Sequence, residues 1–147
     1  MPVIFQKIIK REDLRRNPDV LYVFGDNLVR VGMGGQAGEM RHERNAVGVA
    51  TKASPSAYFR EDTASTIAQK RAIDEDMKPL FVKVNQGGIV VWPSDGIGTG
   101  LSDLPNKAPS TFDHIENKLT ALLRIAHLHS KEAVSYTHLT LPTNREV

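Results

Sequence analysis

Runs of apolar residues that are long enough for a β-strand recur along the chain, at residues 3–9, 20–24, 46–50 and 89–92. The run VLYVF at residues 20–24 has no charged or strongly polar break, which is typical of a strand covered on both faces. Strands of that kind occur in parallel sheets. The pattern therefore predicts a sheet whose strands are mainly parallel.

Two longer stretches carry apolar residues at helical spacing. In residues 61–84 and 109–127 the apolar positions recur at intervals of three and four, as on one face of an α-helix. Pro79 should kink or divide the first of these helices. Residues 36–44 can form a short helix, and the polar residues 11–19 form a connection or a single helical turn. Strands that alternate with helices predict a layered α/β domain.

The composition narrows the class of protein without identifying a ligand. A chain of 147 residues, 40% hydrophobic and 24% charged, is typical of one globular domain. The net charge of +2 is too small to indicate nucleic-acid binding, and no apolar run is long enough to span a membrane. Because the chain has no cysteine, we expect no disulfide and a reducing, cytoplasmic setting. We also expect no metal and no cofactor, since the histidines lack the H-E-x-x-H spacing of a zinc site.

The last fourteen residues, 134–147, need a separate interpretation. Residues 135–141 have the β-forming composition of a short strand, but the string VSYTHLTLPT resembles the conceptual translation of a sequencing adapter. We therefore expect a single domain over residues 1–133 and a non-native tail over residues 134–147. On this expectation a strand that would normally follow the last helix is replaced, and we assign no function to the tail.

Two glycine-rich segments each follow an apolar run directly. Residues 25–35 follow the run at 20–24, and residues 93–100 follow the run at 89–92. In open α/β sheets, ligands bind beyond the carboxyl ends of the strands. Glycines at that position let the backbone turn several N–H groups toward one anion, so that a phosphate is held without a lysine. Two such segments predict a ligand with more than one phosphate, the alternative being that the glycines only form turns.

The glycines fit known phosphate-binding motifs only in part. No glycine is followed by the Lys–Ser/Thr pair of a P-loop, which excludes that site. Gly32, Gly34 and Ala37 do satisfy the relaxed dinucleotide pattern G-x-G-x-x-A. However, residues 25–31 separate the strand from Gly32, and Lys52 stands where the ribose-binding acid belongs. A dinucleotide oxidoreductase is therefore a secondary interpretation.

Several short motifs follow one another in a defined order. GDNL occurs at residues 25–28, GGQA at 34–37, WP at 92–93, GIGTG at 96–100 and LP at 104–105. Together they resemble the motifs of the macrodomain family, the ADP-ribose-binding α/β/α modules, although two glycines stand where that family has three. VATK at residues 49–52 is similar to a motif of its divergent phage and bacterial branch. The resemblance spans residues 3–127 and implies a three-layer α/β/α domain with a mixed, mainly parallel sheet.

The resemblance also implies roles for individual residues. Asp13 would accept a hydrogen bond from the adenine amino group, and the amide of Asn27 would hold the distal ribose. The ribose and the diphosphate would be lined by Gly34, Gly35, Gln36 and Ala37 from the first glycine-rich segment and by Gly96, Ile97, Gly98, Thr99 and Gly100 from the second.

Catalysis would require a group that can act on water. Asp26 and Asp95 are the acids nearest the two segments, so the candidate catalytic residues are Asn27, Asp26 and Asp95. Four basic residues would draw an anionic ligand to the crevice, unless they form a solvated face: Arg41, Arg44, Lys52 and Arg60.

These observations lead to an expected function with open alternatives. We expect the chain to bind ADP-ribose or a related nucleotide diphosphate, either free or attached to a macromolecule. Hydrolysis of an ADP-ribosyl bond, or of a phosphate derivative of ADP-ribose, is one alternative, and a reader without catalysis is another. A phage structural or regulatory protein with an empty fold is a further one. All of the binding hypotheses require the two glycine-rich segments to flank one cleft.

Overall fold

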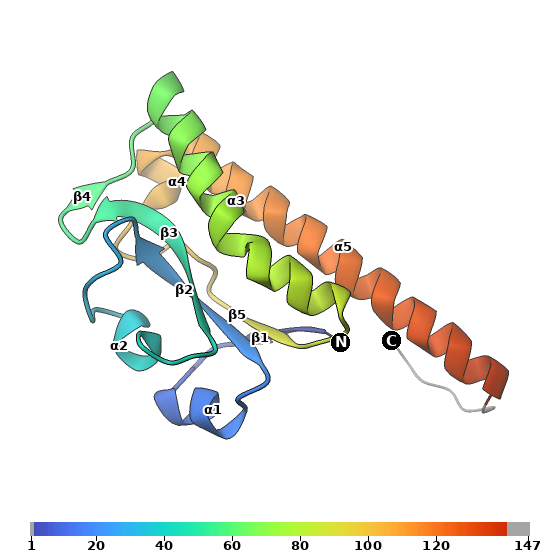
Figure 1. The fold of residues 1–147 in the computed structure, drawn as a ribbon. Coiled ribbons are helices and arrows are strands. Elements are labelled where there is room, and N and C mark those ends of the chain that lie inside the picture. The colour runs from blue at the N-terminus through green and yellow to red at the C-terminus, as the bar shows by residue number, and fades with distance from the viewer. Residues whose placement is uncertain (1, 141–147) are drawn as a thin grey trace.

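The computed structural model describes residues 2–140, with side chains described up to residue 129. In chain order its elements are β1 (Val3–Gln6), α1 (Arg11–Arg16), β2 (Leu21–Asn27), α2 (Ala37–Met40), β3 (Ala46–Ser54), β4 (Ala57–Tyr58), α3 (Thr63–Asn85), β5 (Val90–Pro93), α4 (Leu104–Lys107) and α5 (Pro109–Thr140). Strands and helices alternate along most of the chain, as the hydrophobic pattern predicts, and the protein is a mixed α/β domain (Figure 1).

The described strands form one five-stranded sheet in the order β1-β5-β2-β3-β4. β1, β5, β2 and β3 are parallel to one another, and only β4 runs antiparallel, beside β3. The prediction of a mainly parallel sheet is therefore confirmed. The short antiparallel strand β4 was not predicted, because it has only two residues and both are exposed.

Helices cover both faces of the sheet, which divides the core into two clusters (Figure 1). Along β2, Val23 packs in the cluster that includes residues of α3 and α5, whereas Tyr22 and Phe24 pack in the cluster beside α1 and α2. This alternation follows from the two-residue period of a strand. Because the first part of β2 is covered on both sides, residues 21–24 form an uninterrupted apolar run.

Several element boundaries differ from the sequence prediction. β2 continues to Asn27 because it keeps pairing with β3 beyond its apolar run, as far as Lys52. β3 continues to Ser54 because its last residues pair with β4. The predicted helix over residues 36–44 is only the short α2. Pro79 lies inside α3, which continues from Thr63 to Asn85 and is not divided.

The last helix also extends beyond its predicted end. α5 reaches Thr140 instead of ending at residue 127, so residues 135–140 are helical and not a strand. The remainder of the predicted tail, residues 141–147, lies outside the described residues. Of the helices described, none combines the length and the hydropathy needed to cross a membrane.

Candidate functional site

A pocket of about 320 Å³ opens where β2, β3 and β5 end. The loop of residues 28–36, between β2 and α2, forms one wall and is called the first glycine loop below. The loop of residues 94–103, between β5 and α4, forms the other and is called the second glycine loop. Two segments that lie some sixty residues apart in the sequence therefore flank one cavity. This is the geometric condition that a shared ligand requires.

Most of the predicted binding residues line this pocket. They are Gly34, Gly35, Gln36 and Ala37 on the first side and Gly96, Ile97, Gly98 and Gly100 on the second. Asp26 and Asn27 line it as well, from the end of β2. Thr99, Asp95 and Asp13 lie outside the lining.

Several residues of the pocket walls have main-chain N–H groups that find no acceptor among the described residues. Among the described residues, the N–H groups of Gly34, Gly35 and Gln36 donate no hydrogen bond, and neither do those of residues 97–102. Gly96 and Gly98 hold φ angles of 88° and 84°, a region that L side chains rarely adopt. The second glycine loop therefore depends on glycine for its main-chain conformation.

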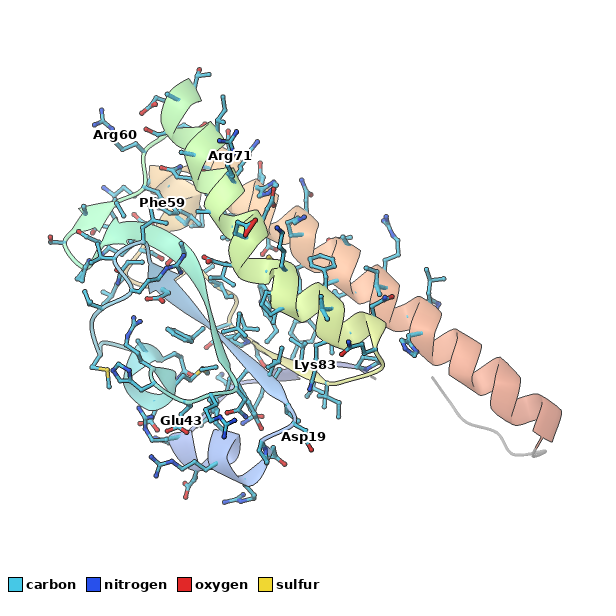
Figure 2. The ribbon with its side chains drawn as sticks, in the orientation of Figure 1. Asp19, Glu43, Phe59, Arg60, Arg71 and Lys83 are labelled. Atoms are coloured by element: carbon cyan, nitrogen blue, oxygen red, sulfur yellow. The ribbon has the colours of Figure 1, made fainter. Side chains whose placement is uncertain are left out.

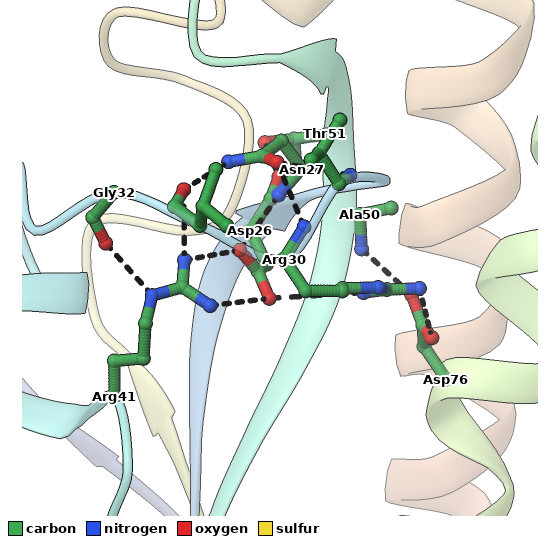
Figure 3. A network of polar contacts seen from close by, with 10 residues as sticks. Asp26, Asn27, Arg30, Gly32, Arg41, Ala50, Thr51 and Asp76 are labelled. Carbon is green, nitrogen blue, oxygen red and sulfur yellow. Dashed lines mark hydrogen bonds and ion pairs between the residues drawn. The ribbon is translucent and has the colours of Figure 1, made fainter.

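Asp26 is held by a buried ion pair beneath the first glycine loop. Its carboxylate faces the guanidinium of Arg41, with Oδ1 2.5 Å from Nη2 and Oδ2 3.3 Å from Nη1 (Figure 3). Both residues are only 8% exposed. Arg41 Nε also donates to the carbonyl of Gly32 at 2.7 Å, which ties the loop to the end of β2.

A second arginine links the same carboxylate to helix α3. Arg30 lies 3.8 Å from Asp26 Oδ2 and donates to Asp76 Oδ1 at 2.7 Å. The other oxygen of Asp76 accepts the N–H of Ala50 in β3 at 2.9 Å (Figure 3). A charge network that includes the pocket residues Asp26 and Arg41 therefore joins β2, β3 and α3.

The amide of Asn27 shapes the loop that follows it. Its Oδ1 accepts the N–H groups of Val29 and Arg30, both at 3.0 Å, and its Nδ2 donates to the carbonyl of Val31 at 2.7 Å. These bonds occupy both acceptor positions of the amide oxygen and one of its two N–H donors. Asn27 thus has a single remaining donor to offer to a ligand.

The other two acidic residues singled out in the sequence make contacts within their own segments. Asp13 lies in α1, where its carboxylate accepts the N–H of Lys10 at 2.9 Å and the side-chain amide of Gln6 at 3.1 Å. Asp95 is exposed in the second glycine loop, and its main-chain carbonyl accepts the hydroxyl of Thr99 at 2.8 Å. Both arrangements stabilise turns or helix ends.

The structure adds pocket residues for which the sequence offered a weak signal or none. Arg41 and Lys52, two of the four basic residues noted above, line the pocket, whereas Arg44 and Arg60 do not. Thr51 is the last buried residue of β3 and donates its hydroxyl to the carbonyl of Asp26 at 3.1 Å. Leu101 lines the rim and is 85% exposed. No group of three or more metal-binding side chains occurs in the part of the chain that the structure describes.

Comparison with known proteins gives a match to one protein family. The model of a family described as Family of unknown function (DUF7831) matches residues 4–118. No curated protein and no solved structure matches the chain.

Proposed function

The chain belongs to DUF7831, the family of unknown function whose model it matches, and we propose that it binds ADP-ribose or a related nucleotide diphosphate. One observation carries this proposal: the same pocket is lined by two sets of residues from distant parts of the chain, whose main-chain N–H groups have no partner among the described residues. On this proposal the mixed α/β fold is macro-like, and the protein works in the cytoplasm.

A diphosphate suits this pocket better than a single phosphate does. Each glycine loop offers several amide dipoles, and oriented amides of this kind bind anionic oxygens without a fixed positive charge. Arg41 is already neutralised by Asp26, so it contributes little net charge to the ligand. Lys52 adds the positive charge at the rim. Two phosphate groups would allow both loops to contribute at once.

The size of the pocket supports a partly enclosed ligand. A cavity of about 320 Å³ lies near the lower end of the ~300–1,000 Å³ range of small-molecule sites. That volume fits a diphosphate with an attached sugar, while the rest of the nucleotide extends over the rim. A ligand bound in this way can still be attached to a macromolecule.

The contacts of the carboxylates favour binding over catalysis by a protein base. A general base must reach the proton that it removes. Asp26 is buried and paired with Arg41, and Asp95 lies outside the pocket lining. We therefore propose a reader of the nucleotide as the principal function, with any hydrolysis depending on water activated by the ligand's own diphosphate.

Calorimetric titration with ADP-ribose, NAD and AMP tests the proposal, and Gly34 provides a matched pair of variants. A Cβ atom at Gly34 would meet no heavy atom within 4 Å, and its φ angle is not positive. Gly34→Glu and Gly34→Gln therefore add nearly the same volume in open space and differ mainly in charge.

We expect ADP-ribose to bind the parent protein more tightly than AMP does. At ~5 Å and an effective dielectric constant of ~20, a carboxylate repels a phosphate charge by about 3 kcal/mol. Gly34→Glu should therefore weaken ADP-ribose binding at least ~10-fold, whereas Gly34→Gln should change it by less than ~3-fold. Equal losses in both variants would contradict an electrostatic cradle, and a parent protein that binds none of the three compounds would refute the proposal.

A further inference from the structure

Ser102 is buried in the second glycine loop without using its hydrogen-bond donors. It is only 7% exposed and lines the pocket. Neither its hydroxyl nor its main-chain N–H forms a hydrogen bond with the described residues. The other polar or charged residues that are buried to this extent each have a side chain with at least one hydrogen bond: Asp26, Asn27, Arg41, Asn45, Thr51, Gln69 and Thr111. Because buried polar groups are nearly always paired, Ser102 is an exception in the part of the chain that the structure describes.

The hydroxyl of Ser102 is open to the pocket. Three side-chain polar atoms of the described residues are fully enclosed without a partner, in Gln36, Thr66 and Trp92, and Ser102 Oγ is not among them. It therefore keeps contact with solvent, and the pocket is the solvent-accessible space that Ser102 lines. A hydroxyl in this position can pair with a ligand without giving up a bond within the protein.

The main chain just after Ser102 is held firmly. The N–H of Leu104 donates to the carbonyl of Gly98 at 2.8 Å, which closes the loop around Ser102. Figure 2 shows helix α4, which begins at Leu104, close to Phe59, and both residues belong to the same buried cluster. Ser102 is thus fixed in position before a ligand arrives, which lowers the cost of binding.

The chemistry of the pocket favours a sugar hydroxyl as the partner of Ser102. Main-chain N–H groups only donate, whereas the serine hydroxyl both donates and accepts. On the other wall, the side-chain amide of Gln36 forms no hydrogen bond with the described residues, and its Oε1, an acceptor, is enclosed without a donor. The ionised oxygens of a diphosphate are acceptors only, so they cannot pair with a second acceptor. A sugar hydroxyl can both donate and accept.

We propose that Ser102 is a specificity-determining residue that binds a hydroxyl of the sugar attached to the diphosphate. The identity of this ligand rests on the proposed function. The main-chain N–H groups of the two loops bind the phosphates of any nucleoside diphosphate, and Ser102 adds a contact that only a nucleoside diphosphate sugar can make. The pocket therefore distinguishes these two classes of ligand by one neutral hydrogen bond.

Calorimetric titration with ADP-ribose and ADP tests this role, because ADP has the diphosphate but lacks the second sugar. Ser102→Ala removes only the hydroxyl oxygen. It should weaken ADP-ribose binding by about 3- to 10-fold, the range for one neutral hydrogen bond, and change ADP binding by less than ~2-fold. Ser94→Ala is the matched control, because Ser94 is exposed in the same loop and lies outside the pocket lining. This variant should bind both compounds as the parent does.

Thermal unfolding without ligand shows whether the hydroxyl supports the fold instead. An unpaired hydroxyl contributes no hydrogen bond to the folded state, so Ser102→Ala should unfold at the same temperature as the parent protein or at a higher one. A lower unfolding temperature would assign the hydroxyl to the fold and overturn the inference.

Titration with ribose 5-phosphate and methyl phosphate separates this inference from the proposed function. The two compounds carry a phosphate with and without sugar hydroxyls, and NMR follows the amide resonance of residue 102. If ADP-ribose does not bind, but ribose 5-phosphate binds at least ~3-fold more weakly to Ser102→Ala and methyl phosphate is unaffected, the proposed function fails and the role of Ser102 stands. If Ser102→Ala leaves ADP-ribose binding unchanged, or weakens ADP equally, the inference is wrong and the proposed function stands. If none of the four compounds binds, both are wrong.

Discussion

Replacing Arg41 by methionine should destabilise the protein through the carboxylate that it leaves behind. Arg41→Met keeps a long, flexible side chain over Phe24, whose ring centroid lies 5.4 Å from the guanidinium carbon. The variant loses the pair with Asp26, which is 8% exposed, and the bond to the Gly32 carbonyl. Breaking a buried pair by removing one partner costs about 3–5 kcal/mol. Arg30, at 3.8 Å, still faces the carboxylate, so we expect about 3 kcal/mol.

Urea unfolding followed by circular dichroism measures this loss. With a slope of about 1–3 kcal/mol per molar urea, the midpoint should fall by roughly 1–3 M. The first glycine loop should loosen as well, because Arg41 no longer holds the carbonyl of Gly32. Weaker ADP-ribose binding in the still-folded variant would report that change separately.

A double-mutant cycle decides whether the buried charge is the cause. In Asp26→Asn/Arg41→Met the carboxylate is gone. The loss in free energy of unfolding of this double variant should therefore be smaller than the sum of the two single losses, by about 0.5–3 kcal/mol. A loss below about 1 kcal/mol in Arg41→Met, or additive effects in the cycle, would refute the argument that the buried pair stabilises this part of the pocket.

Two further outcomes concern packing and pH. A Cβ at Gly38 would lie 2.6 Å from the main-chain oxygen of Met33, so Gly38→Ala should destabilise the domain by about 1–3 kcal/mol in thermal melts. Gly34→Ala, where the space is open, should change the stability of the domain by less than about 0.5 kcal/mol. Equal losses of stability in Gly38→Ala and Gly34→Ala would contradict the steric argument. Hydrogen bonds from the hydroxyl and then the N–H of Ser110 lower the pKa of Glu61 below its ordinary value of 4.5. Because the pKa of Glu61 is lower in the folded state, these hydrogen bonds stabilise the protein above about pH 4.5, and the stabilisation is lost as the pH falls through the folded pKa. In an acid titration, the free energy of unfolding of Glu61→Gln should therefore fall less steeply over that pH range than that of the parent protein.

The sequence predicts the framework well because burial on both faces leaves a direct trace in it. The apolar run at residues 20–24 marks β2 in this way, and the glycines after it mark the loop. The ends of the strands are harder to predict, since β2 continues through the polar residues Asp26 and Asn27, which stay in the sheet by pairing with β3. Periodicity carries no information about such pairing.

The position of the candidate site could be inferred, but the function of its polar side chains could not. Glycines after two strands predict where a pocket opens, because parallel strands end at one edge of the sheet. That Asp26 pairs with Arg41, and that Asn27 closes its own loop, depends on contacts between residues up to fifteen positions apart. No spacing rule connects such residues, and a carboxylate beside a glycine loop has the same appearance in the sequence whether it binds a ligand or supports the fold.

The open space at Gly34 and Gly100 bears on how sites of this kind can change over time. Because the unpartnered donors of these residues belong to the main chain, the side chain at such open positions can be exchanged without removing a donor. Related chains could therefore diverge widely in residue identity while keeping the same recognition chemistry. Backbone torsion angles in the two loops would be a better measure of shared ancestry for such a site than a list of matching amino acids.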